Sequence, residues 1–180
     1  MPADHRSRPS LMPVTLSALA LAAVFAMTHL LPIPGGKKAV TAAIANGRLF
    51  DQSPSFDAAD VWVRLEGFGE QGREAYQVMM YTGDLVFPLA ILALLLLTAR
   101  YLLLIDGAAR LPRVAALLAT AFFGIDMIEN SIIYYLLTTF PDASRLGSLL
   151  GIVTSAKFAF LASAILVLLL SAARYIVGRR

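Results

Sequence analysis

The chain has 180 residues, of which 58% are hydrophobic and only 15% are charged, and its formal net charge is +3. Soluble domains have about 25% charged residues, so this composition excludes an ordinary soluble domain and indicates a single domain in a lipid bilayer. The basic residues are scattered between apolar runs, which argues against a nucleic-acid partner, and the lack of cysteine excludes disulfides and thiolate metal sites.

The first apolar run covers residues 11–31 and follows a short polar segment that carries His5, Arg6 and Arg8. A membrane span needs about 20 apolar residues, whereas the apolar region of a signal peptide has about 7–15. We therefore predict that this run is a retained first transmembrane helix. The alternative is a signal peptide that is cleaved at a weak site near residues 24–26.

The longest polar stretch, residues 32–77, is predicted to be an ordered, partly helical loop that caps the bundle. Residues 53–57 indicate a helix start, and the glycines at 67, 69 and 72 are expected to end that helix. Its apolar face is expected to lie on the membrane surface. The residues of this face are Phe56, Val61, Leu65 and Phe68. Trp62 and Tyr76 are aromatic residues typical of the membrane interface.

The second span is predicted at residues 78–98, with an extension to residue 105 as the alternative. Pro88 has no N–H to donate to the carbonyl of Asp84, so a bend is expected between the two. Gln77, Tyr81, Asp84 and Pro88 are spaced by three or four residues and therefore share one helix face. This polar face is expected to point away from lipid.

The third span is predicted at residues 114–138, after a link with a turn signal at Asp106 and Gly107. It carries Asp126, Glu129 and Asn130, whose offsets of three and four residues place them on one helix face. An ionisable side chain in mid-membrane is costly, at roughly 2.5–3.5 kcal/mol each on insertion scales. This face is therefore a candidate functional site.

The fourth span is predicted at residues 147–171 and carries Lys157 near its middle. The opposite face has a small residue at every fourth position, a pattern that allows close helix packing. This small-residue ladder consists of Gly147, Gly151, Ser155, Ala159 and Ser163. We expect the ladder to pack within the chain, and contact with a second copy or another membrane protein is the alternative.

The fold class predicted from these spans is all-α, an integral membrane four-helix bundle with both termini in the cytoplasm and residues 32–77 outside. Cytoplasmic ends of membrane helices carry an excess of arginine and lysine. The arginines on the predicted cytoplasmic side are Arg6, Arg8, Arg100, Arg110, Arg113, Arg174, Arg179 and Arg180. We expect a multi-pass protein of a bacterial cytoplasmic membrane, with the lipid bilayer as its main surroundings.

The predicted spans bring one polar cluster together in the outer half of the bundle, about 9–18 Å from the outer helix ends. Its residues are Asp84, Asp126, Glu129, Asn130 and Lys157, with Lys157 ion-paired to Glu129 or Asp126. The rim of this cluster is predicted to consist of His29, Gln77, Tyr81 and Tyr134. One lysine cannot neutralise three acids, so the surplus acids must be protonated, hydrated or neutralised by a cation. The spacing predicts no metal site, and no cofactor fingerprint occurs.

Three classes of function fit this pattern. The first is a site that binds or relays protons, cations or a small polar group. The second is an intramembrane enzyme in which a carboxylate acts as general acid or base on a lipid or isoprenoid. The third is an accessory subunit in which the charges only fix the helix register.

His29 near the end of the first span, Asp84 early in the second span and the long first loop together suggest a family likeness. This arrangement resembles the emopamil-binding family of sterol isomerases and its four-span relatives. The resemblance is confined to the overall arrangement, because family motifs match only at scattered positions. It implies the enzyme class, with a substrate that enters from the bilayer.

Overall fold

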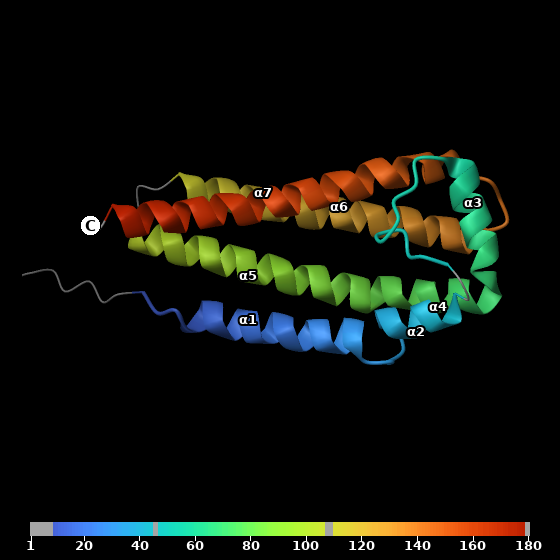
Figure 1. Cartoon of the computed structure of the whole chain (residues 1–180), viewed down its shortest axis with the longest axis horizontal. Helices are drawn as coiled ribbons and strands as arrows, with labels where there is room; N and C mark the ends of the chain where they lie inside the picture. The colour runs from blue at the N-terminus through green and yellow to red at the C-terminus, as the bar shows by residue number, and fades with distance from the viewer. Residues whose placement is uncertain (1–8, 45–46, 107–109, 179–180) are drawn as a thin grey trace, which may run out of the picture.

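The computed structural model describes residues 9–44, 47–106 and 110–178, and these residues form an all-helical fold. Four segments are long and apolar enough to cross a membrane: Met12–Leu30, Gly69–Ile105, Leu111–Thr139 and Arg145–Val177. Figure 1 shows these segments running side by side along the long axis, with both ends of the described chain at the same end of the bundle. We name this the terminal end, and the opposite end, which carries α2, α3 and α4, the cap end.

Nine helical elements make up the described chain. The first segment joins α1 (Met12–Phe25) to a single π-helical turn, η1 (Ala26–Leu30). The cap contains α2 (Lys37–Ala43), α3 (Ala58–Gly67) and α4 (Gly69–Tyr81). The remaining spans are α5 (Gly83–Ile105), α6 (Leu111–Thr139) and, after the short 3-10 helix η2 (Arg145–Leu149), α7 (Leu150–Val177).

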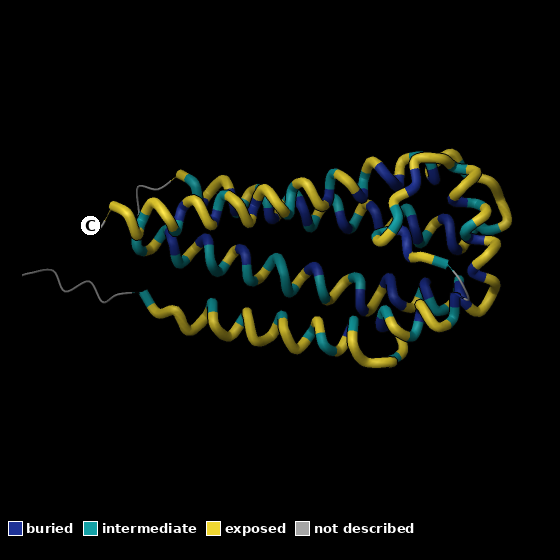
Figure 2. The backbone as a smooth tube through the Cα atoms, in the orientation of Figure 1, coloured by how far each residue is buried: buried dark blue, intermediate teal, exposed yellow. Residues whose placement is uncertain are grey.

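The terminal half of the bundle has an apolar core between α5, α6 and α7. Its fully buried alanines, Ala115, Ala119 and Ala164, allow the helix backbones to approach closely. The α1 helix lies outside this core and packs mainly on α5. Figure 2 shows it exposed along most of its length, whereas the buried residues lie on α5, α6, α7 and the cap. In the apolar stretch of this first segment, only 6% of the residues are buried inside the protein.

The cap end has a second core, in which α3 packs against η2 and α4, and α4 packs against α6. Val61, Leu65 and Phe68 of α3 are almost fully buried there together with Tyr76. The prediction that this face lies on the membrane surface was therefore wrong, because the face is used for packing inside the protein. Of the four residues predicted for it, Phe56 alone is largely exposed, at 61%.

The two aromatic residues predicted for the membrane interface have different environments. Tyr76 is 1% exposed, and its hydroxyl oxygen accepts a hydrogen bond of 3.2 Å from the backbone N–H of Phe50. It therefore belongs to the core of the cap. Trp62 is half-buried, and its indole N–H donates to the carbonyl of Pro141 at 2.9 Å.

The second span is longer than predicted and is interrupted at a different residue. Gly72 does not end a helix, since α4 runs through it from Gly69 to Tyr81. The helix is broken at Thr82, whose φ and ψ of −118° and −90° are not helical, and α5 continues through Pro88. A β-carbon at Gly83 would lie 2.7 Å from the carbonyl oxygen of Gly35. The link between η1 and α2 therefore approaches the chain closely at the helix break. The hydropathy of the sequence alone does not reveal this break.

The small-residue ladder of α7 does not form one continuous contact. Gly147 and Gly151 are buried against α3 and the segment before it, where added β-carbons would lie 3.2 Å from the Cα of Ala58 and 2.7 Å from the carbonyl of Ser55. Ser155, Ala159 and Ser163 are exposed. The two glycines of the ladder thus pack within the chain. The other three members face away from it.

Some sequence predictions fall on residues that the structure does not describe. Gly107 of the turn at Asp106 and Gly107 lies outside the described residues. The same holds for the terminal basic residues His5, Arg6, Arg8, Arg179 and Arg180.

Candidate functional site

A buried ion cluster joins α6 to α7 in the half of the bundle nearer the cap. Lys157 of α7 forms ion pairs with Glu129 and with Asp126, the latter at 3.0 Å between Nζ and Oδ1. The hydroxyl of Thr154, one turn before Lys157, donates to the other oxygen of Glu129. The exposed fractions are 4% for Asp126, 1% for Glu129, 0% for Thr154 and 7% for Lys157. Burial with mutual pairing is how an apolar interior accommodates charged groups.

Helix periodicity explains why α6 makes polar contacts with both α7 and α5. Asp126 and Glu129 are three residues apart, so both face α7 across the same stretch of α6. Asn130 follows on the side of α6 toward α5, where its amide Nδ2 donates to the backbone carbonyl of Asp84 at 2.9 Å. Pro88 lies four residues after Asp84 and cannot supply the usual helical donor to that carbonyl. Asn130 thus replaces the missing hydrogen bond and ties α5 to α6.

Replacing Asn130 with leucine should lower the free energy of unfolding by about 1–3 kcal/mol, because the Asp84 carbonyl then has no donor. In a Pro88→Ala background the N–H of residue 88 is able to donate to this carbonyl. The loss caused by Asn130→Leu should therefore be about 1 kcal/mol smaller in that background. Denaturant unfolding of the four proteins in micelles gives this coupling directly. Equal losses in both backgrounds would mean that Asn130 acts through another contact.

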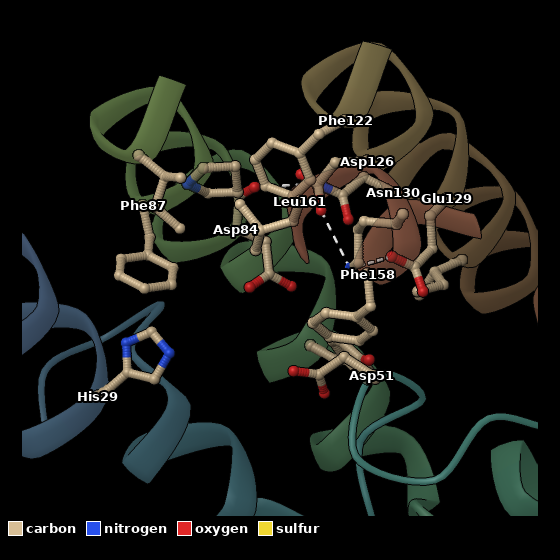
Figure 3. Close-up of a pocket in the computed structure, with 15 residues that line it drawn as sticks. His29, Asp51, Asp84, Phe87, Phe122, Asp126, Glu129, Asn130, Phe158 and Leu161 are labelled. Atoms are coloured by element: carbon tan, nitrogen blue, oxygen red, sulfur yellow. Dashed lines mark hydrogen bonds and ion pairs between the residues drawn. The ribbon is translucent and has the colours of Figure 1, made fainter. Parts of the chain in front are cut away.

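A cavity of about 110 Å³ adjoins the ion cluster, and it is lined from η1, the α2–α3 link, α4, α5, α6 and α7. This volume holds several water molecules, since each needs at least about 10–15 Å³ on this measure. Figure 3 shows the Asp84 side chain pointing toward the space between His29 and Asp51, with Asp126, Asn130 and Glu129 on the opposite wall. The ionisable residues that line the cavity are His29, Asp51, Tyr76, Asp84, Asp126, Glu129 and Lys157.

His29 is held at the cavity wall by its own helix and by aromatic rings. Its Nδ1 lies 2.8 Å from the hydroxyl of Thr28, and its ring stacks on Phe25 at a centroid distance of 4.7 Å. Phe87 of α5 meets the same ring edge-on at 4.5 Å. Of the four predicted rim residues, His29 is the one that lines this cavity.

The other three predicted rim residues lie elsewhere. Tyr81 and Tyr134 pack against each other at a centroid distance of 5.1 Å, and Tyr81 is 55% exposed. Gln77 donates a hydrogen bond of 3.4 Å to the carbonyl of Leu137. None of these three is among the cavity-lining residues. The break at Thr82 explains the positions of Gln77 and Tyr81, because it separates the face of α4 from the face of α5 on which Asp84 lies.

Asp51 and Thr154 also belong to the site, although neither was predicted from the sequence. Thr154 lies three residues before Lys157 on the same face of α7, so helix spacing alone was a usable signal. Asp51 had no such signal, because it lies in the link between α2 and α3. Lys37 of α2 pairs with Asp51 at 3.1 Å. The guanidinium of Arg64 donates to the carbonyls of Ser53 and Arg48 at 2.6 and 2.8 Å, which holds this link against α3.

Two carboxylate oxygens of the cavity lack partners. Oδ2 of Asp126 and Oδ1 of Asp51 are buried, and neither has a hydrogen-bond partner among the described residues. A buried acceptor without a donor costs about 1–3 kcal/mol, and more when it is charged. These atoms therefore favour the entry of a hydrogen-bond donor, which is either water or part of a ligand.

An apolar groove of about 810 Å³ lies between α1, α5 and α7 and adjoins the polar cavity. Its walls are aliphatic and aromatic, and its one hydroxyl group, on Thr98, already donates to the carbonyl of Leu94 at 2.8 Å. Phe87, Ile91 and Leu161 line both the groove and the cavity. These three side chains therefore form the boundary between the apolar groove and the polar cavity.

No group of three or more His, Asp or Glu residues in the described part of the chain is arranged to hold a metal ion. Comparisons of the chain with known protein families, with curated proteins and with solved structures found no match. The resemblance to the emopamil-binding family therefore rests on overall arrangement alone. Four apolar helices and the buried cluster of Lys157, Asp126 and Glu129 are the firm basis for a functional interpretation.

Proposed function

We propose that this protein binds a single amphipathic molecule from within the bilayer, with the apolar chain in the groove and the polar end in the cavity. The observation that carries this proposal is that the two spaces lie side by side and share the lining residues Phe87, Ile91 and Leu161. Ligand sites typically have volumes of about 300–1,000 Å³, with mostly apolar walls and a few polar groups that fix orientation. The groove supplies the volume and the apolar walls of such a site, and the cavity supplies the polar groups.

The dimensions of the groove support a chain from one membrane leaflet. Its lining on α5 extends from Phe87 to Thr98, which is roughly 16 Å at ~1.5 Å per residue. This is about half of a hydrocarbon core that is ~30 Å thick. The chain would run from the cavity toward the terminal end of the bundle, parallel to the surrounding lipid.

The apolar core on the terminal side of the cavity favours a one-sided site over a path through the protein. Leu95, Ala99, Ala119 and Leu168 occupy the space between α5, α6 and α7 there. A proton or cation relay across the membrane needs polar stations along its whole length. Binding of a polar group is therefore the part of the sequence hypothesis that we retain.

Chemistry at the bound polar end would use the carboxylate of Asp126. One oxygen of Asp126 is held by Lys157, whereas the other lacks a partner in the cavity wall. A carboxyl group placed in this way is able to accept or donate a proton at a bound molecule. Glu129 has both oxygens engaged by Lys157 and Thr154, so its proposed role is to position the lysine.

We propose, from the positive-inside rule, that the cap end lies outside and that both chain ends lie in the cytoplasm. Both ends of the described chain lie at the same end of the bundle, which supports this proposal (Figure 1). Arg100, Arg110, Arg113 and Arg174 lie toward the terminal end. With this orientation the polar end of the proposed ligand would lie in the outer half of a bacterial cytoplasmic membrane.

The proposal is tested with a long-chain alcohol and a long-chain amine that each carry a photoreactive diazirine in the chain. The full chain is reconstituted in phosphatidylcholine vesicles, and labelled peptides are mapped by mass spectrometry. We expect saturable labelling of groove residues by at least one probe. Leu161→Trp, which fills the junction with the cavity, should reduce this labelling about tenfold.

Leu166→Trp is the matched control, because Leu166 is 56% exposed on the same helix and does not line the groove. Saturable labelling should survive in this variant. Labelling that never saturates, or that falls equally in both variants, would show that the groove is ordinary lipid-facing surface and would overturn the proposal.

A further inference from the structure

The charges around the cavity are unbalanced. Lys37 pairs with Asp51, which leaves Asp84, Asp126 and Glu129 to be balanced by Lys157. In the described chain the carboxylate of Asp84 makes no hydrogen bond and no ion pair, although it lines the cavity. By formal count, three carboxylates therefore face one ammonium group, and the cavity lacks positive charge.

The buried acceptors in the cavity call for donors. Oδ2 of Asp126 has no partner in a residue that is only 4% exposed, and Oδ1 of Asp51 is also without one. A protonated primary amine brings three N–H donors and no acceptor. It is therefore able to hydrogen-bond to several of these carboxylates at once, whereas a hydroxyl group brings one donor and two acceptor lone pairs.

The apolar part of the cavity wall also suits an organic cation. Phe87, Phe122 and Phe158 contribute aromatic rings to it (Figure 3). The ammonium of Lys157 already lies 5.1 Å from the ring centroid of Phe158. Aromatic faces attract ammonium groups, most strongly where water is excluded. Within the described residues no cluster of acids or histidines is arranged for a metal ion, which favours an amine over an inorganic cation.

We propose that the polar end of the bound amphiphile is a protonated amine, held between Asp84 and the free oxygen of Asp126. This inference rests on the proposed function, since it specifies the chemistry of the same site. The ligand class is a membrane amphiphile with one apolar chain and one amino group. Lys157 keeps its pairing with Glu129 and Asp126, and the incoming ammonium supplies the second positive charge.

The test compares the two photoreactive probes described above, which differ only in an amine or a hydroxyl head. In the native chain we expect the amine to half-saturate groove labelling at a concentration at least about tenfold lower than the alcohol. Asp84→Asn should remove most of this preference, because a higher amine concentration is then needed to half-saturate the labelling. Asp106→Asn is the control, because Asp106 is an exposed acid at the other end of the same helix.

The outcomes separate this inference from the proposed function. Equal labelling by the two probes in the native chain would overturn the amine assignment and leave the amphiphile site standing. An amine preference that survives both Asp84→Asn and Asp126→Asn would also overturn it, since the carboxylates would not be its source. Failure of both probes to label the groove saturably would overturn the proposed function itself.

Discussion

Lys157→Met is expected to lower the free energy of unfolding by about 3–5 kcal/mol, the range measured when one partner of a buried ion pair is removed. Asp126 and Glu129 would then be left one helical turn apart, nearly fully buried and without a positive charge. Among the described residues, the hydroxyl of Thr154 would be the one side-chain partner left to Glu129. Chemical unfolding in detergent micelles, followed by circular dichroism, measures the loss.

Two further variants make this result specific to charge. Lys38→Met is the matched control, because Lys38 is exposed on α2 and its replacement should change stability by no more than about 0.5 kcal/mol. The triple change Lys157→Met, Asp126→Asn and Glu129→Gln should recover most of the loss, since neutral groups are far less costly to bury than unpaired charges. If the triple variant is as unstable as Lys157→Met, unbalanced charge is not the cause.

Gly151→Leu is expected to destabilise the protein by about 1–3 kcal/mol through overpacking. A β-carbon at Gly151 would lie 2.7 Å from the carbonyl oxygen of Ser55 and 2.7 Å from the ring of Phe56. That carbonyl also accepts a 2.7 Å hydrogen bond from the N–H of Gly151, in the first turn of α7 where helix N–H groups lack partners. The substitution should therefore detach the segment before α3 and increase its cleavage in limited proteolysis.

Gly124→Leu is the control for Gly151→Leu. No atom lies within 4 Å of the position that a β-carbon would take at Gly124 on α6. Because glycine is about 1 kcal/mol less favourable than alanine inside a helix, this variant should be neutral or slightly stabilising. Equal destabilisation by the two changes would contradict the packing of Ser55 and Phe56 on α7.

The same geometry decides how the accessory-subunit hypothesis is best tested. Gly151 contacts residues of its own chain, so its substitution does not report on a partner. Ser155, Ala159 and Ser163 are the exposed members of the ladder. A substitution such as Ala159→Leu is therefore the informative one for a second copy or another membrane protein at α7.

The sequence by itself determined the four apolar spans and the three charged residues that meet at the buried ion cluster. Charged groups inside a hydrocarbon layer are so costly that Lys157 had few positions other than against Asp126 and Glu129. Helix periodicity placed those two acids on one face, and the missing N–H of Pro88 marked the Asp84 carbonyl as needing another donor. Local rules were sufficient for each of these features.

Tertiary structure alone decided the rest. Asp51 reaches the cavity because Lys37 and Arg64 hold a link whose path no helix or strand period specifies. The break at Thr82 moves Gln77 and Tyr81 off the face of Asp84, and it accompanies a close approach of Gly35 to Gly83. The groove exists because α1 packs mainly on α5 and leaves space beside α7. Apolar residues that face lipid and those that face a groove look alike in a sequence, since both are surrounded by hydrocarbon.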